Sequence, residues 1–334
     1  MKDFIALLPK VELHLHIEGT LEPELMFALA KRNNIDIPFR TYEEVSAAYD
    51  FHNLQSFLDI YYQGANVLVN EQDFYDLTWA YLLRCKADNV LHTEIFFDPQ
   101  THTARGIAFD TVVNGIYRAL VQGKQELGIT SQLIMCFLRH LDEDDAFVML
   151  NHALAHQDKI IGVGLDSAEL GNPVEKFERV FQQARKHGFK SVAHAGEEGP
   201  ASNISDALTV LQVDRVDHGV RCTEDKALLA QLIAQGTPLT VCPLSNTKLK
   251  VFEHMADHNI VKLLRQGVCV TINSDDPAYF GGYMTDNFNA VADVHPMEKA
   301  EIAQFTINAI NASFISAQEK QRLLALTHSY LAQS

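Results

Sequence analysis

The amino-acid sequence predicts a single (β/α)8 barrel. Two observations support this fold class: short runs rich in Val, Ile and Leu recur along the chain, and amphipathic stretches separate them. Nearly continuous apolar runs are typical of parallel strands that are buried on both faces. Strands that alternate with helices over this length indicate a barrel. The eight predicted strands are residues 10–16, 90–97, 132–138, 160–166, 190–194, 214–218, 238–242 and 268–274.

The stretches between these strands have the pattern of helices. Four of them, residues 109–127, 174–187, 206–211 and 227–235, are amphipathic, and several end shortly before a glycine such as Gly128, a helix-stop signal. An open, doubly wound sheet is the alternative arrangement. That fold is disfavoured because no glycine-rich phosphate loop follows the first strand.

The longest connection, residues 20–89, lies between the first and second strands. This connection is predicted to form two or three helices. At the mouth of a barrel these helices would form a cap over the site. After the last strand, helices at about 296–311 and 316–331 are predicted to complete the outer layer. Because there is no low-complexity linker or internal repeat, residues 1–334 are predicted to form one domain.

Composition narrows the class of partner. The chain has 27 Lys and Arg against 43 Asp and Glu, a formal net charge of −16, which disfavours nucleic acid and anionic membranes. No apolar run is long enough for a signal peptide or a membrane span. The five cysteines form no C-x-x-C pair, as expected for reduced thiols in the cytoplasm. We therefore expect a soluble cytoplasmic protein that acts on a small molecule; its oligomeric state is left open.

Polar side chains occur where predicted strands end. His14 and His16 lie two residues apart on the first strand and therefore point to the same side. His194 ends the fifth strand, His218 ends the sixth, and Asp275 follows the eighth. Active sites of such barrels lie at the carboxyl ends of the strands. These side chains are therefore predicted to meet in one mouth.

Four of these residues form a suitable ligand set for one zinc ion. His14, His16 and His194 offer three nitrogens and Asp275 an oxygen, which leaves an open position for water. A divalent ion there would lower the pKa of water from about 16 to about 7. A second ion would need a bridging ligand, such as a lysine at the end of the fourth strand. Residues 162–167 contain none, so the site is predicted to hold one Zn²⁺.

Five segments, taken in order, resemble the adenosine/adenine deaminase family, and the resemblance covers essentially the whole chain. These segments are HLHIEG at 14–19, HAGE at 194–197, DHG at 217–219, CPLSN at 242–246 and NSDDP at 273–277. Members of this family are zinc-containing barrels that hydrolytically remove the 6-amino group of a purine. Stretches that resemble the adenine deaminase branch are residues 18–23, 96–100, 197–200 and 277–282.

The resemblance assigns a role to each position. The four predicted ligands would hold zinc, and Glu197 would donate a proton to purine N1, which requires a pKa raised by burial. His218 would orient the attacking hydroxide and help to take its proton. Asp276 would bond N7, and the backbone N–H of Gly164 would approach N3. Competing explanations are a core histidine for His218, a helix N-cap for Asp276 and a simple bend for Gly164.

Glu18 bears on the choice of substrate. Adenosine deaminases resemble this segment but usually carry Asp there, where it contacts the ribose. The extra methylene of Glu18 would place a carboxylate in the ribose space, or let it contact the bare N9 edge of a free base. We therefore predict that adenine is converted to hypoxanthine and ammonia. Adenosine is the next candidate, followed by a 6-modified aminopurine.

Two hypotheses from other functional classes remain open. One is a different metal hydrolase that cleaves an ester, an amide or a phosphotriester. The other is a non-catalytic zinc-binding barrel. The non-catalytic hypothesis is disfavoured because a structural zinc site needs none of Glu197, His218 and Asp276, which are all present.

Overall fold

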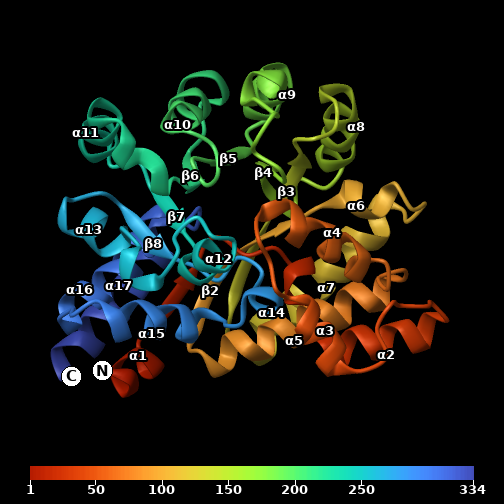
Figure 1. Cartoon of the computed structure of the whole chain (residues 1–334), viewed down its shortest axis with the longest axis horizontal. Coiled ribbons are helices and arrows are strands. Elements are labelled where there is room, and N and C mark those ends of the chain that lie inside the picture. Colours follow the sequence, from red (N-terminus) through yellow and green to blue (C-terminus); the bar gives the residue numbers. More distant parts are fainter.

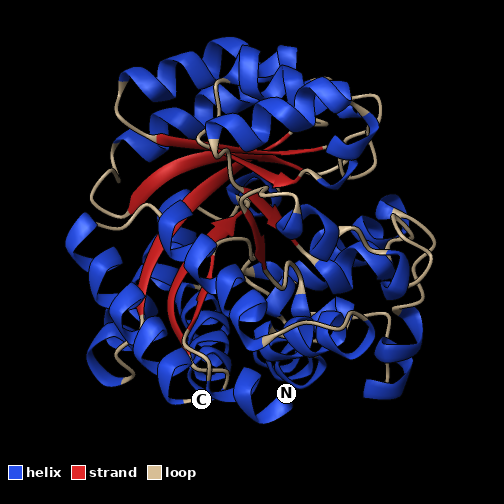
Figure 2. Ribbon diagram, turned by 90° about the vertical axis from the view of Figure 1, so that its left-hand side faces the viewer, coloured by secondary structure: helices blue, strands red, loops and turns tan.

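All eight predicted strands are present and form one parallel sheet that curls around the centre of the molecule (Figures 1 and 2). The computed structural model describes residues 1–334. The strands neighbour one another in sequence order, which with the surrounding helices is the (β/α)8 barrel. They are β1 (Lys10–Glu12), β2 (Val90–Phe97), β3 (Thr130–Leu138), β4 (Ile160–Asp166), β5 (Lys190–Ala195), β6 (Arg215–His218), β7 (Leu239–Val241) and β8 (Val270–Ile272).

Helices surround the sheet on its outer side (Figure 2). The predicted amphipathic stretches correspond to α7, to α9 with a preceding 3-10 turn, to a π-helical turn after α10, and to α11. The helices are α1 (Lys2–Leu7), α2 (Pro23–Asn33), α3 (Tyr42–Ala48), α4 (Leu54–Ala65), α5 (Glu71–Ala87), α6 (Pro99–Thr103), α7 (Phe109–Glu126), α8 (Glu143–Leu154), α9 (Glu178–Lys186), α10 (Ala201–Asp206), α11 (Lys226–Gln235), α12 (Pro243–Lys248), α13 (Ile260–Arg265), α14 (Pro277–Phe280), α15 (Met284–Val294), α16 (Lys299–Ala312) and α17 (Ala317–Gln333).

The first strand is shorter than predicted. We expected residues 10–16, but β1 ends at Glu12, and beyond it single bridges at Leu15 and His16 replace a continuous ladder. The barrel is closed there by main-chain bonds: the N–H of His16 donates to the carbonyl of Asp275 (3.0 Å), and the N–H of Asp275 donates to the carbonyl of His14 (3.1 Å). The chain segments that carry His14 and Asp275 are therefore joined directly.

Side chains reinforce this closure. The Oδ1 of Asn273 accepts the N–H of Leu13 (2.8 Å), and the carboxylate of Glu12 accepts the N–H of Ser274 (3.1 Å) and its hydroxyl. The hydroxyl of Tyr81 donates to the other oxygen of Glu12 (2.6 Å). The first two residues of the NSDDP segment thus hold β8 against β1.

The insertion between β1 and β2 contains four helices, not two or three. α5 packs against α7 in the outer ring, so it is the crossover helix that connects two parallel strands. α4 contributes apolar residues to the cavity at the barrel mouth and is the core of the predicted cap. An aromatic cluster that includes Phe51, Phe57, Tyr279 and Phe280 joins the cap to α14. The cap is therefore packed onto the segment that follows the eighth strand.

The barrel interior is layered. Below the mouth, Phe96, Ile134, Cys136 and Val192 form a small apolar cluster. Deeper in the barrel, the buried Glu94 accepts a hydrogen bond from the guanidinium of Arg215, whose central carbon lies 4.1 Å from the centre of the Phe314 ring. Burial raises the pKa of Glu94, but the charge of Arg215 and the contact with His92 outweigh it and lower the pKa to about 2.

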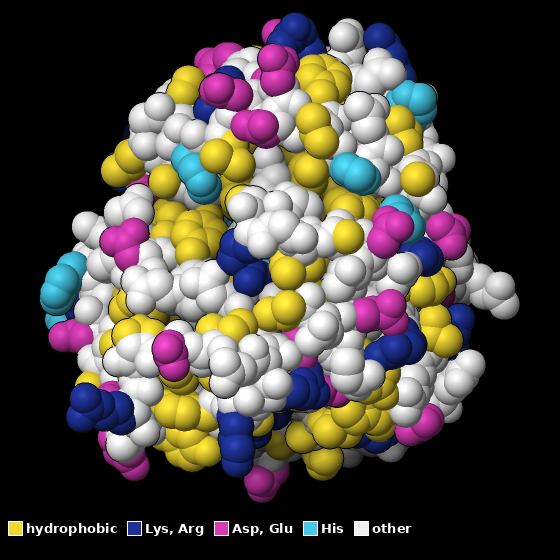
Figure 3. All heavy atoms as spheres, turned by 90° about the vertical axis from the view of Figure 1, so that its right-hand side faces the viewer, with side chains coloured by type: hydrophobic (Ala, Val, Ile, Leu, Met, Phe, Trp, Pro, Cys, Tyr) yellow, Lys and Arg dark blue, Asp and Glu magenta, His cyan; other side chains and the backbone are white.

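The surface shows no field of a single sign on the face drawn in Figure 3, where acidic and basic side chains are interspersed. None of the helices is long and apolar enough to cross a membrane.

The Glu94–Arg215 pair predicts a pH-dependent contribution to stability. We expect Glu94→Gln to lower the free energy of unfolding by about 3–5 kcal/mol at pH 7, because it leaves a buried guanidinium without its counter-charge. The pKa of Glu94 is lower in the folded state than its usual value near 4.5. The contribution is therefore fully present above that value and is lost as the pH falls towards 2. Urea unfolding at pH 7 and at pH 3 measures it.

The exposed pair between Arg265 and Glu301 provides the control. Glu301→Gln should change the free energy of unfolding by no more than about 1 kcal/mol. Equal effects of the two substitutions would contradict the assignment of Glu94.

Candidate active site

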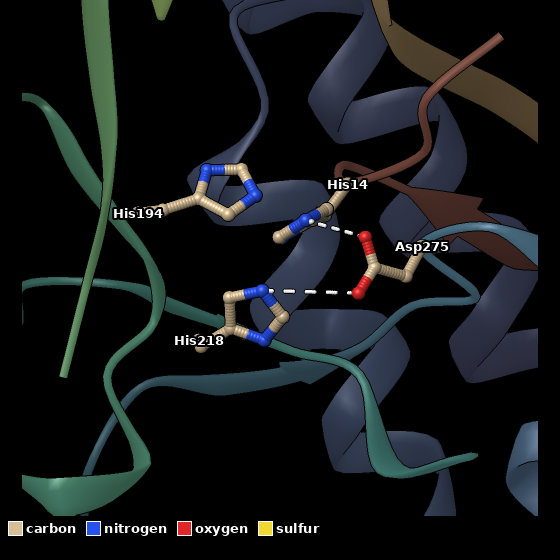
Figure 4. A group of neighbouring side chains, drawn as sticks. All are labelled: His14, His194, His218 and Asp275. Atoms are coloured by element: carbon tan, nitrogen blue, oxygen red, sulfur yellow. Dashed lines mark ion pairs between the residues drawn. The ribbon is translucent and has the colours of Figure 1, made fainter. Parts of the chain in front are cut away.

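The predicted site residues converge at the carboxyl end of the barrel. Figure 4 shows side chains from four separate strand ends pointing towards one another. All are almost fully buried. The residues that the structure brings together here are His14, His16, His194, Glu197, His218, Asp275 and Asp276.

The two oxygens of Asp275 face different partners. Oδ1 lies 3.1 Å from the Nε2 of His14, whereas Oδ2 lies 3.7 Å from the Nε2 of His218 (Figure 4). Oδ1 also lies 3.5 Å from the Nε2 of His16. The Nε2 atoms of His16 and His194 are 3.3 Å apart. Two ligands at 2.0–2.1 Å from a tetrahedral ion are about 3.3–3.4 Å apart. These distances are in the range of ligands that share one ion. The four residues whose donor atoms all lie within 4.8 Å of one another are His14, His194, His218 and Asp275, whereas His16 groups with Asp275 and Asp276.

The hydrogen bonds of His14 fix which nitrogen faces the site. Its Nδ1 lies 3.2 Å from the carbonyl oxygen of Thr240 and 3.0 Å from its hydroxyl, and that hydroxyl donates to Asp217 (2.8 Å). A carbonyl oxygen only accepts, so Nδ1 carries the proton. Nε2 is then a free lone pair, and it is buried without a hydrogen-bond partner. A metal ion is the partner that such a nitrogen fits.

Asp217 lies beside the site, although sequence analysis assigned it no role beyond its place in the DHG segment at 217–219. Its Oδ2 lies 3.5 Å from the Nδ1 of His194, and its Oδ1 lies 3.9 Å from the Nδ1 of His14. Burial lowers the pKa of His194, but the nearby carboxylate of Asp217, with Asp166 and Asp275, raises it to about 9. The carboxylates thus favour a positive charge at this point, which a divalent cation also supplies.

His218 is held in one tautomer by a chain of hydrogen bonds. The N–H of Ile260 donates to the Nδ1 of His258 (3.2 Å), so the Nε2 of His258 donates to the Oδ1 of Asn246 (3.3 Å). The amide nitrogen of Asn246 then donates to the Nδ1 of His218 (3.2 Å). Burial lowers the pKa of His218 well below its usual value. His218 is therefore neutral and presents an Nε2–H to the site.

Two residues of the site have unusual backbone conformations. His218 and Asp275 have φ angles of 61° and 63°, in the left-handed region that non-glycine residues rarely adopt. Such conformations cost about 1–3 kcal/mol each and persist where the surrounding structure imposes them. His218 is the last residue of β6 and Asp275 lies three residues after β8, and both side chains point into the mouth (Figure 4).

Glu197 lies in the loop after β5. It is buried, and its Oε1 is 3.6 Å from the Nε2 of His218. Burial and the charge of Asp275 raise the pKa of Glu197 well above its usual value. Both effects favour the protonated form of the carboxyl group, which is the form that can donate a proton.

Glu169 holds this loop in place, and no motif in the sequence identified it. Its carboxylate accepts the backbone N–H groups of Gly196 (2.7 Å), Glu197 (3.1 Å), Glu198 (3.0 Å) and Gly199 (2.8 Å). The side chain of Asn203 donates a fifth bond (2.8 Å). Hydrogen bonds to a charged acceptor are stronger than neutral ones. The position of Glu197 thus depends on a buried carboxylate from the loop after β4.

Asp276 faces the cavity. Its side chain makes no capping bond to α14, and its Oδ1 is buried without a partner, so the structure does not support the N-cap explanation. Burial and the charge of Asp275 raise the pKa of Asp276 well above its usual value. Any side chain at Gly19 would collide with this carboxyl group, which explains the glycine there.

Glu18 and Gly164 lie outside the lining of the cavity. The Oε1 of Glu18 accepts the backbone N–H of Asp98 (3.2 Å) and a bond from the Nε2 of His102 (2.8 Å). A side chain at Gly164 would collide with the sulfur of Cys136, so packing inside the barrel also requires a glycine there. Contact of either residue with a substrate stays a prediction.

The cavity is partly open to solvent, and its space, including that open part, is about 400 Å³. α4 lines it with Leu54, Phe57, Leu58, Tyr61 and Tyr62. Two further carboxyl groups, Asp98 and Asp166, lie on its wall and were not predicted. The site thus combines an apolar lid with an unusually acidic floor and wall.

Comparison with known proteins agrees with this picture of a metal-dependent hydrolase barrel. The family model for adenosine deaminase matches residues 9–330. An adenine deaminase from Vibrio parahaemolyticus is 67% identical over 333 residues, covering 100% of this chain and 99% of that protein. The crystal structure of adenine deaminase from Arthrobacter aurescens has a TM-score of 0.96 and 50% identity, covering 97% of this chain and 99% of that one. A structure of an amidohydrolase from Burkholderia ambifaria with bound zinc has a TM-score of 0.90 and 26% identity, covering 100% and 95%.

The chain therefore belongs to the adenosine deaminase family. It is a hydrolase that acts on the C–N bond of a cyclic amidine.

The role of Glu169 predicts a local change in backbone protection. We expect Glu169→Ala to speed amide hydrogen exchange of residues 196–199 at least about tenfold, because four N–H groups lose a charged acceptor. Hydrogen–deuterium exchange with mass spectrometry measures this. Glu178→Ala, at an exposed position on α9, should leave these amides unchanged. Unchanged exchange in Glu169→Ala would show that other contacts hold the loop.

Proposed function

We propose that this chain hydrolyses adenine to hypoxanthine and ammonia. The observation that carries this proposal is its full-length similarity, at 67% identity, to a protein named adenine deaminase. The site supplies matching chemistry: a buried acid, a hydrogen-bond donor and a cluster of metal-binding side chains surround one cavity. The partner is then a small purine base.

We infer that His14, His16, His194 and Asp275 hold one Zn²⁺ ion. The spacing of their donor atoms and the free Nε2 of His14 support this assignment. When bound, the ion supplies a Lewis acid and lowers the pKa of water towards 7. Asp217 and Thr240 orient the two histidines from behind.

The remaining side chains act on the base. Glu197, protonated because it is buried beside Asp275, donates its proton to N1 and makes C6 electrophilic. Asp276 is protonated for the same reason and donates a hydrogen bond to N7, which is an acceptor. His218 offers its Nε2–H to the attacking water and orients it. To accept the proton of that water as well, His218 would need the tautomer with its proton on Nδ1 and a free lone pair on Nε2. That tautomer would break the chain of hydrogen bonds that begins at the N–H of Ile260.

Two finer assignments belong to the same proposal. We place the protein in the cytoplasm, supported by five cysteines that form no disulfide. Adenosine is the second candidate substrate, since the family as a whole is described by that nucleoside. The acidic wall of the cavity favours the free base adenine over adenosine.

The choice of base over nucleoside predicts a kinetic preference. We expect kcat/KM for adenine to exceed that for adenosine at least about a hundredfold, because buried polar groups reject a ligand that cannot pair with them. Loss of ultraviolet absorbance of each compound, with the zinc-loaded protein, measures the two values. A reversed preference would keep the deaminase chemistry and contradict the assignment of adenine.

The acid role predicts a specific defect. We expect Glu197→Gln to lower kcat by about 10²–10⁴-fold, because the amide cannot transfer a proton to N1. Metal content, measured by plasma mass spectrometry, should stay at one ion per chain. His16→Ala should instead lower the metal content. Retention of kcat in Glu197→Gln would assign the proton donor to another group.

A further inference from the structure

Two carboxyl groups on the cavity wall have oxygens without hydrogen-bond partners. Asp98 follows β2 and Asp166 ends β4, and both line the cavity while being only 3% and 2% exposed. Oδ1 of Asp98 and both oxygens of Asp166 lack a partner. A carboxyl oxygen of each lies within 4.8 Å of the other and of a nitrogen of His16. Buried acceptors without partners are rare in proteins, so such a group calls for an occupant.

The neighbours of these two residues satisfy their oxygens only in part. The hydroxyl of Tyr61 donates to Oδ2 of Asp98 (3.3 Å), and the Nδ1 of His16 lies 3.5 Å from Oδ2 of Asp166. No Lys or Arg lines the cavity. Burial raises the pKa of both residues, and the charge of Asp166 raises that of Asp98 further, so the two can share one proton, but no cation compensates them and acceptor positions remain. A ligand that presents an N–H group would satisfy these positions.

We infer that Asp98 and Asp166 form a subsite that accepts the N9–H of an unsubstituted purine. This inference rests on the proposed function and makes it more specific. With N1 at Glu197 and N7 at Asp276, the ring N–H that remains to adenine is at N9. A nucleoside carries a carbon substituent at N9 and has no hydrogen to donate there. The subsite therefore selects 6-aminopurines that are unsubstituted at N9.

The inference also changes the role expected of Glu18. Glu18 accepts the backbone N–H of Asp98 and is itself held by His102, while Asp98 lines the cavity and Glu18 does not. Glu18 is then a positioning residue for Asp98, and Asp98 is the residue that contacts the base. Both belong to segments that resemble the adenine deaminase branch.

A second cation is the other ligand chemistry that two carboxylates and a histidine would accept. It is disfavoured because the Nε2 of His16 already faces Asp275 and His194. One imidazole would then have to bridge two ions through its two nitrogens. Metal stoichiometry distinguishes the two occupants.

The test compares adenine with 9-methyladenine, which lacks only the N9–H donor. Wild-type protein should favour adenine in kcat/KM at least about a hundredfold. Asp98→Asn keeps the shape of the side chain but removes its charge, and it should lower this preference at least about tenfold, mainly by slowing adenine. Asp110→Asn, which removes an exposed acid that contacts His156 outside the cavity, is the matched control and should keep the wild-type preference.

Binding of the products provides a readout that does not need turnover. Calorimetry should show that hypoxanthine binds the wild type more tightly than 9-methylhypoxanthine, and that Asp98→Asn narrows this difference. A preference that is unchanged in Asp98→Asn, or two metal ions per wild-type chain with one lost in that variant, would overturn the subsite. Absence of adenine turnover by the wild type would instead contradict the proposed function, and the binding comparison would still decide on the subsite.

Discussion

The hydrogen bonds that join the segment after β8 to the segment after β1 determine the geometry of the whole site. Asp275 exchanges main-chain bonds with His14 and His16, so the carboxylate and the two histidines are placed by the same contacts that close the barrel. Asn273 and Ser274 reinforce the closure through Leu13 and Glu12. A shift of one strand relative to the other would separate the ligands. The same contacts therefore close the barrel and place the side chains of the metal-binding cluster.

This closure also explains how two adjacent aspartates acquire opposite properties. Asp275 lies among three histidines and its pKa is lowered despite burial, whereas Asp276 faces carboxylates and its pKa is raised. One residue is thus suited to bind a cation and the next to donate a hydrogen bond. Pairs of acids whose surroundings move their pKa values apart mark the division of labour in an active site. Here a turn of the chain at Asp275, with its positive φ, achieves the separation.

Much of the fold and of the site could be predicted because the relevant signals are local. Each strand is a short apolar run, and His194 and His218 sit at strand ends that parallel geometry must bring together. The extent of the first strand was wrong because β1 pairs only briefly before single bridges take over. The insertion held four helices, not the two or three predicted, and one of them, α3, is only seven residues long and leaves a short helical pattern.

The residues that sequence reasoning missed act through partners far along the chain. Glu169 binds backbone N–H groups 27–30 residues away, and any sequence there supplies such groups. The backbone N–H of Asp98 donates to the side chain of Glu18, which is 80 residues away in the sequence. Neither contact leaves a spacing that can be recognised, because one partner in each is the main chain. Only the folded structure shows that these carboxylates serve the site.

The cap and the acid chemistry are linked by burial. Burial, together with the charge of Asp275, favours the protonated form of Glu197 and of Asp276. Both are shielded from water by α4, whose first N–H, at Leu54, donates to the Oε1 of Glu198 (3.3 Å), the residue next to Glu197. If α4 moved away, water would reach both carboxyl groups and their pKa values would fall towards ordinary ones. The insertion therefore does more than cover the mouth, because it favours the protonated forms that the proposed mechanism uses.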